Sequence, residues 1–181
     1  MTKPLPNLIN VRALVERRAE VGGCCTVTGF TRLRGYLADD RGDIDVALSL
    51  GKEDGWSVIV GSIKGEVTLQ CQRCLEPFSW PIHAAVALAL VASEEEAATF
   101  SENSEAGELG GAYEPRIVTD APFSLHELVE DELILAMPIV ARHPEGTCEL
   151  RLPQEEMQNT PVRGNPFDVL AEIKSPDKKK H

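Results

Sequence analysis

Apolar and polar residues alternate along several stretches of this 181-residue chain, and this alternation limits the folds that it can adopt. The stretch 43–50, DIDVALSL, has isoleucine, valine or leucine at every second position, and the stretches 56–71 and 78–90 continue with the same period. Because successive side chains of a strand point to opposite faces, a period of two predicts strands with one buried face. We therefore expect an α+β protein built on a mainly antiparallel sheet, which can curl toward a barrel.

Two helices are predicted near the ends of the chain. An N-terminal helix follows Asn10, which suits an N-cap, and is expected to end at Gly22 and Gly23. A short C-terminal helix is predicted in NPFDVLAEI, residues 165–173, with Phe167 on its apolar side.

A central helix is predicted over residues 124–137. The sequence S-L-H-E at its start forms a capping box, in which Ser124 binds the amide three residues later. The outer face of this helix is expected to carry Glu127, Glu130 and Asp131.

The composition changes between residues 93 and 115, where seven acidic residues and no basic ones stand among glycine, serine and asparagine. Such a stretch is typical of a solvated connection, so we expect a mobile acidic loop there. The loop belongs to a single domain predicted over residues 1–152, and residues 153–181 are expected to form a C-terminal arm with a basic tail.

The charge of the chain is negative and unevenly distributed. The formal net charge is −11, and the whole excess lies in residues 91–181, which hold 8 basic and 19 acidic residues. Residues 1–90 hold ten of each kind. Proteins that bind nucleic acid broadly need a basic surface, because Lys and Arg release the counterions of the phosphates. The acidic half should therefore repel RNA and attract basic proteins.

Cys71 and Cys74 stand three positions apart at the predicted tip of a hairpin. A redox pair of the thioredoxin type needs a helix N-terminus at the first thiol, which the flanking strands do not provide. A zinc site needs four ligands, and His143 with Cys148 can supply the other two. The thiols can equally be small reduced packing residues. The spacing leaves zinc binding and simple packing both open.

Signatures of an enzyme or of a membrane protein are missing from the sequence. It contains neither of the glycine-rich patterns that bind phosphates, and its acidic pairs fall in predicted turns and on exposed strand faces. The longest uncharged run, 77–93, alternates in polarity and contains a proline, which predicts a strand and not a membrane span. Since the N-terminus lacks the apolar core of a secretory signal, we expect a cytoplasmic protein. Since enzyme motifs are missing, we expect neither catalytic activity nor a small-molecule substrate.

Three stretches resemble the bacterial YceD family, also called DUF177 or the large ribosomal RNA subunit accumulation protein family: VTLQCQRCLEPF, LVEDELILAMPIVARH with the cysteine after it, and NPFDVLAEIK. The resemblance implies a cytoplasmic, non-enzymatic role in the synthesis, processing or stability of 23S ribosomal RNA. The residues that match the family are Cys71, Gln72, Arg73, Cys74, Glu130, Asp131, Glu132, His143, Cys148, Asn165, Pro166 and Phe167.

Two hypotheses describe how such a role is carried out. In the first, the protein is a ribosome biogenesis factor whose acidic half binds a basic large-subunit ribosomal protein or a precursor of the 50S particle. In the second, the first half of the chain binds 23S ribosomal RNA directly, and Arg32 and Arg34 lie on one face of a strand predicted within residues 26–37. The phosphate contacts of this hypothesis are Arg12, Arg17, Arg18, Arg32, Arg34 and Arg73. It also includes a structural zinc site or a redox-sensitive site at the cysteines. The candidates for partner binding are Arg32, Arg34, Arg73, Glu130, Asp131 and Phe167.

Overall fold

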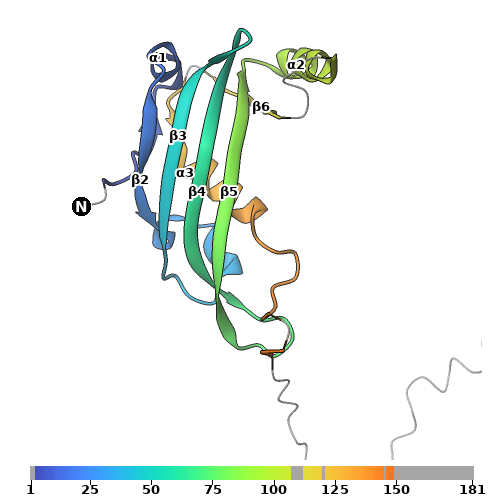
Figure 1. The fold of residues 1–181 in the computed structure, drawn as a ribbon. Helices are drawn as coiled ribbons and strands as arrows, with labels where there is room; N and C mark the ends of the chain where they lie inside the picture. The colour runs from blue at the N-terminus through green and yellow to red at the C-terminus, as the bar shows by residue number, and fades with distance from the viewer. Residues whose placement is uncertain (1–2, 107–111, 120, 145, 149–181) are drawn as a thin grey trace, which may run out of the picture. The chain divides into compact units, whose positions relative to one another are not determined.

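The computed structural model describes residues 3–106, 112–119, 121–144 and 146–148. Within these residues, five strands form one sheet in the order β2-β3-β4-β5-β6. All neighbours are antiparallel except β5 and β6, which are parallel, and the sheet stays open (Figure 1). The α+β class is confirmed, but the sheet does not close into a barrel. The strands are β2 (Glu20–Thr26), β3 (Asp43–Glu53), β4 (Trp56–Gln70), β5 (Pro77–Val91) and β6 (Glu114–Ile117).

Two hairpins place the three central strands side by side. Asp54 and Gly55 join β3 to β4 with φ angles of 48° and 87°, as in the two-residue turns that match the twist of antiparallel strands. The second hairpin is longer, because β4 pairs with β5 from Ser57 opposite Leu90 down to the pair at its tip, Gln70 opposite Pro77. The predicted position of the C-x-x-C motif at a hairpin tip is therefore correct.

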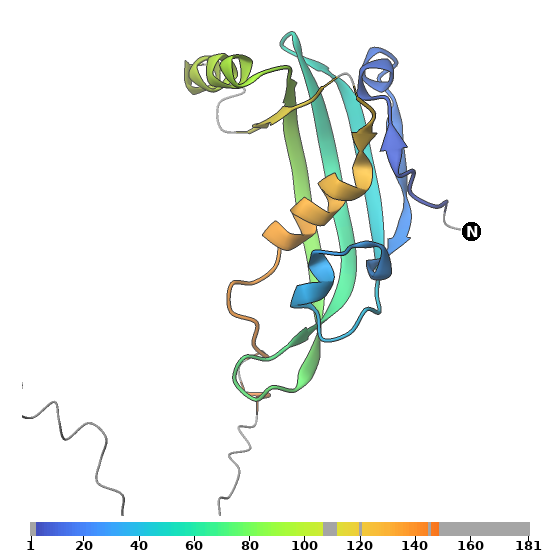
Figure 2. The ribbon, with the colours of Figure 1, turned by 180° about the vertical axis from the view of Figure 1, so that it is seen from behind.

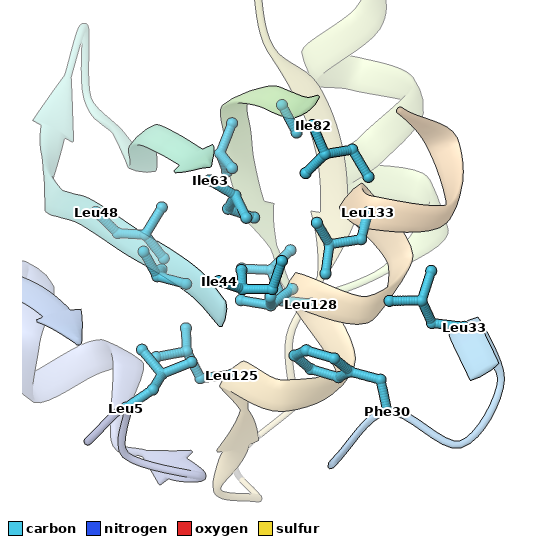
Figure 3. Close-up of a cluster of buried hydrophobic side chains, with 14 of the residues drawn as sticks. Leu5, Phe30, Leu33, Ile44, Leu48, Ile63, Ile82, Leu125, Leu128 and Leu133 are labelled. Carbon is cyan, nitrogen blue, oxygen red and sulfur yellow. The ribbon is translucent and has the colours of Figure 1, made fainter. Parts of the chain in front are cut away.

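The helix α3 (Leu125–Leu135) lies across one face of this sheet (Figure 2). Its apolar side chains recur at helical spacing and meet the alternating apolar side chains of the strands, so the two periods predicted from the sequence share one core. Figure 3 shows this core, in which the buried residues of α3 and of the strands include Leu125, Leu128, Leu133, Ile44, Ile63 and Ile82.

Ser124 caps α3, because its hydroxyl accepts a hydrogen bond from the amide of Glu127 at 3.2 Å. The strands β1 (Leu8–Ile9) and β7 (Phe123–Ser124) pair directly before this cap. The cap therefore fixes both the start of α3 and the place where the N-terminal segment joins it.

We expect Ser124→Ala to lower the free energy of unfolding by about 1 kcal/mol, the usual cost of losing an N-cap hydroxyl. Urea denaturation measures this change. The matched control is Ser49→Ala on the exposed side of β3, which should change stability by less than about 0.5 kcal/mol. Equal effects of the two substitutions would contradict the cap.

The N-terminal helix is shorter than predicted. The side chain of Asn10 accepts a hydrogen bond from the amide of Ala13 and caps α1 (Val11–Glu16), as expected. The helix then ends well before the two glycines, which lie in β2. Gly23 is needed there for a different reason, since a Cβ at this position would lie 2.7 Å from the carbonyl oxygen of Lys3.

Residues 26–37 do not form the predicted strand. They contain two short 3-10 helices, η1 (Val27–Gly29) and η2 (Leu33–Tyr36). Phe30 and Leu33, three positions apart, are both buried. The spacing of three brings both side chains to the core, which a strand with its period of two would not allow. Arg32 and Arg34 therefore do not project from a strand.

The acidic stretch also differs from the prediction, because it contains α2 (Glu94–Ala106). The hydroxyl of Ser93 accepts a hydrogen bond from the amide of Glu96 at the start of this helix. Phe100 is buried and meets the ring of Trp56 edge-on, with 5.0 Å between the ring centroids. One aromatic anchor and one cap are thus enough to order this acidic segment as a helix.

Two further predictions concern the C-terminal residues and membrane-spanning segments. The C-terminal helix around Phe167 and the arm over residues 153–181 lie outside the described residues. Among the helices that the structure does describe, none has the length and apolar character needed to cross a membrane.

Candidate metal centre

The tip of the long hairpin is a tight turn that directs two thiols to one side. The amide of Cys71 donates to the carbonyl of Glu76 at 3.0 Å, and the amide of Leu75 donates back to the carbonyl of Cys71 at 2.9 Å. Leu75 has a φ angle of 64°, in the left-handed region, which lets the chain reverse within these few residues. Cys71 is buried by the turn and Cys74 is half-buried beside it.

The segment that follows α3 reaches the hairpin tip. After its last turn the chain runs past Pro138, and the carbonyl of Ala141 accepts a hydrogen bond from the amide of Gln72 at 2.9 Å. This bond holds the segment next to the C-x-x-C turn. His143 and Cys148 therefore lie next to the thiols of Cys71 and Cys74, although about seventy residues separate the first pair of residues from the second in sequence.

The structure therefore brings together all four residues that the sequence suggests as metal ligands. The ligand atoms of Cys71, Cys74, His143 and Cys148 all lie within 4.8 Å of one another. The Sγ atoms of Cys71 and Cys148 are 3.8 Å apart, and the Sγ of Cys74 is 3.4 Å from the Nδ1 of His143.

The sulfur–sulfur distance of 3.8 Å and the sulfur–nitrogen distance of 3.4 Å fit a tetrahedral zinc ion. With zinc–sulfur bonds of about 2.3 Å and zinc–nitrogen bonds of about 2.0 Å, the edges of the tetrahedron are about 3.8 Å between two sulfurs and about 3.5 Å between sulfur and nitrogen. Three thiols and one imidazole are also a common donor set of structural zinc sites. The residues present can thus hold a metal ion.

Hydrogen bonds and burial give the thiols different acidities. Burial alone would raise the pKa of Cys71, but hydrogen bonds from the hairpin backbone and from His143 outweigh it and lower the pKa to about 5. One of these donors is the amide of Arg73, 3.4 Å from the Sγ of Cys71. The pKa of Cys148 is raised to about 11 by burial and by the two neighbouring thiols.

The imidazole of His143 is held in place by an aromatic neighbour. Its ring lies 4.8 Å from the ring of Phe78, centroid to centroid, and Phe78 is buried in β5. The other two cysteines, Cys24 and Cys25, lie in β2 and do not belong to the cluster. Cys25 is half-buried and packs against the core.

The candidates for partner binding on α3 have a structural role. Glu130 is only 6% exposed, contrary to its predicted place on the outer face. Its carboxylate accepts hydrogen bonds from the amides of Arg32 and Leu33, at 2.6 and 3.1 Å, and pairs with the Arg32 guanidinium at 3.0 Å. Asp131 bridges Arg32 at 2.7 Å and Arg116 at 3.0 Å. This network joins the loop before η2 to α3.

The other candidates are dispersed. Arg34 pairs with Asp40 at 3.7 Å. Arg73 is exposed at the hairpin tip, where it makes no ion pair with any residue that the structure describes. Phe167 lies outside the described residues. The burial of Glu130 and the participation of Arg116 were not predicted. No local sequence pattern links Glu130 to Arg32, 98 positions away, or Asp131 to Arg116, 15 positions away.

Comparison with known proteins identifies a family. Residues 59–174 match the family model described as "Large ribosomal RNA subunit accumulation protein YceD". A protein of that name from Haemophilus influenzae is 29% identical over 179 residues, which cover 94% of this chain and 96% of that protein. No solved structure matches the chain.

Proposed function

Because the chain belongs to the YceD family of large ribosomal RNA subunit accumulation proteins, we propose that it acts in large-subunit biogenesis by binding a basic ribosomal protein or a precursor of the large subunit. It works in the cytoplasm as a binding protein and not as an enzyme, and its effect on 23S ribosomal RNA is indirect. A family model that covers residues 59–174 supports the role itself.

The ion pairs that the arginines form within the chain favour a protein partner over RNA. Arg32, Arg34 and Arg116 all face carboxylates of the same chain, at distances between 2.7 and 3.7 Å. An arginine that contacts a phosphate from this position must first leave its own carboxylate. With a net charge of −11, the chain attracts basic proteins more readily than RNA.

Direct RNA binding is the second candidate. Arg73 and Arg142 are exposed close to the metal centre and make no ion pair within the described part of the chain. Two such cations can contact a phosphate backbone, so the hairpin tip is the place where this alternative is tested.

The second part of the proposal concerns the cluster of three cysteines and one histidine, which holds a structural zinc ion. Zinc here supplies a crosslink between the hairpin tip and the segment after α3. The four protein ligands complete a tetrahedron, which is typical of a structural and not a catalytic site.

The partner can be tested by fluorescence anisotropy. We expect the purified protein to bind at least one basic large-subunit ribosomal protein, and to bind 23S ribosomal RNA fragments weakly at about 150 mM salt. RNA affinity that falls at least tenfold between about 50 and 200 mM salt, and that disappears in Arg73→Ala/Arg142→Ala, would instead establish direct RNA binding. The Lys64→Ala variant, changed on the exposed side of β4, serves as the control for the loss of a positive charge elsewhere.

A further inference from the structure

Three concavities follow one another along the outer side of α3 and the segment after it. The first, of about 710 Å³, shares Arg32, Arg116 and Asp131 with the second, of about 290 Å³. The second shares Ile134 and Leu135 with the third, of about 600 Å³. We call these three adjoining concavities together the α3 groove. It extends from the start of α3 to Ala141, next to the metal centre.

The end of the α3 groove near the metal centre is apolar and open to solvent. Tyr36, Leu135 and Ile139 line it, and these side chains are 61%, 74% and 97% exposed. Val140 follows directly and is 48% exposed. Single apolar residues at a surface are ordinary, but a gathered apolar patch usually marks a site of interaction.

The middle of the α3 groove carries an excess of negative charge, with three carboxylates and two guanidinium groups in its lining. Glu114 and Glu132 line it, and neither forms an ion pair with the residues that the structure describes. The guanidinium of Arg116 lies close by but pairs with Asp131. Burial, followed by the charges of Glu114 and Asp131, raises the pKa of Glu132. A cation from outside the molecule would relieve this repulsion.

We propose that the α3 groove binds a segment of a basic partner protein, which places a Lys or Arg side chain at Glu114 and Glu132 and aliphatic side chains against Leu135 and Ile139. This inference rests on the proposed function, since it assigns the surface that holds the basic partner. The complementarity is specific to protein. RNA phosphates are repelled by the two carboxylates and gain nothing from exposed aliphatic side chains.

The walls of the apolar end connect this surface to the metal centre. Gln70 and Gln72 of the long hairpin form one wall, and Met137, Pro138 and Ala141 form the other. The two walls are joined by the hydrogen bond between the Gln72 amide and the Ala141 carbonyl. Gln72 follows Cys71 directly in the chain, and Ala141 stands two residues before His143, so this end of the groove adjoins the metal centre.

The test uses the large-subunit ribosomal protein that binds most tightly in the anisotropy assay described above. We expect Leu135→Ser/Ile139→Ser to weaken its binding at least about tenfold, because the substitutions remove two aliphatic side chains that the partner buries in the complex. Glu132→Gln should weaken it about threefold to tenfold. Leu135 and Ile139 are exposed and Glu132 is half-buried, so the variants should remain folded, which urea denaturation checks.

Two matched controls separate the α3 groove from general effects. Ile117→Ser removes an apolar side chain that is 44% exposed in β6, and Glu66→Gln removes an exposed charge from β4. Neither residue lines the groove, so both variants should bind within about twofold of the unchanged protein.

The possible results distinguish a failure of the proposed binding surface from a failure of the proposed function. If the ribosomal protein binds all variants equally well, the α3 groove is not the site, while the proposed function stands. If none of the purified ribosomal proteins binds and RNA fragments do, the proposed function and this inference both fail. If Leu135→Ser/Ile139→Ser merely converts a dimer of the chain into monomers in analytical ultracentrifugation, the occupant is a second copy and the inference is wrong.

Discussion

Protein purified without chelators is expected to contain about one zinc ion per chain, and Cys74→Ser or Cys148→Ser should lower the zinc affinity at least about a hundredfold. Each substitution removes one of four ligand atoms that lie within 4.8 Å of one another. A serine hydroxyl is a poor replacement for a thiolate, because zinc in such sites is bound by deprotonated sulfur. Metal analysis combined with competition against a chelator of known affinity measures the change.

Loss of the metal should loosen one end of the molecule and leave the rest folded. The core under α3 reaches the metal centre at Cys71, but most of its members are apolar side chains of the sheet and the helix that are not metal ligands. The amide of Gln72, which donates to Ala141, reports the tether between the hairpin tip and the segment after α3. We expect its hydrogen exchange to accelerate at least tenfold after chelation, whereas central amides of β3 and β4 stay protected.

The control for the cysteine variants is Cys24→Ser, which changes a thiol of β2 outside the cluster. It should keep the full zinc content and the slow exchange at Gln72. Zinc-free protein from a chelator-free preparation, with a protected Gln72 amide, would show that packing alone holds the tip. That result would make the four residues ordinary reduced side chains.

The strands and helix caps were predictable from the sequence because they depend on local patterns. The alternation in β3, β4 and β5 follows from one face of the sheet being buried, and the caps at Asn10 and Ser124 satisfy backbone amides close by in the chain. The prediction of a strand within residues 26–37 was wrong because Phe30 and Leu33 reach the core from 3-10 turns, which a search for a period of two does not recognise. The helix α2 was not predicted because the acidic composition of its segment indicates a solvated loop, whereas the apolar side chain of Phe100 holds the segment to the sheet.

The sequence indicates which four residues could bind a metal ion, but not how they come together. The C-x-x-C spacing with a further histidine and cysteine is compatible with a zinc site, but the approach of His143 to Cys74 depends on where the segment after α3 is held. That position is set by a backbone bond between Gln72 and Ala141, which carries no sequence signature. The burial of Glu130 has no signature either, since its partner Arg32 is 98 positions away.

Replacing Glu130 by alanine is expected to lower the free energy of unfolding by about 2 to 4 kcal/mol. The carboxylate is 6% exposed and accepts hydrogen bonds from two backbone amides, those of Arg32 and Leu33. The substitution leaves the buried Leu33 amide without a partner and removes an ion pair from Arg32. Glu130→Gln should cost less, about 1 to 2 kcal/mol, because its carbonyl oxygen can still accept from both amides. Urea denaturation at pH 7 measures both values.

The pH dependence of stability separates the charge of Glu130 from its hydrogen bonds. Burial raises the pKa of this carboxyl, but hydrogen bonds from Leu33 and Arg32 outweigh it and hold the pKa below the ordinary value of 4.5. The contribution of the group is therefore complete above about pH 4.5 and is lost as the pH falls through the lower pKa of the folded state. Glu130→Gln should flatten the acid side of the stability curve, whereas Glu127→Ala, on the exposed side of the same helix, should leave its shape unchanged. A Glu130→Ala protein within about 0.5 kcal/mol of the unchanged one, with the same acid profile, would mean that the loop before η2 is held to α3 by Phe30 and Leu33 alone.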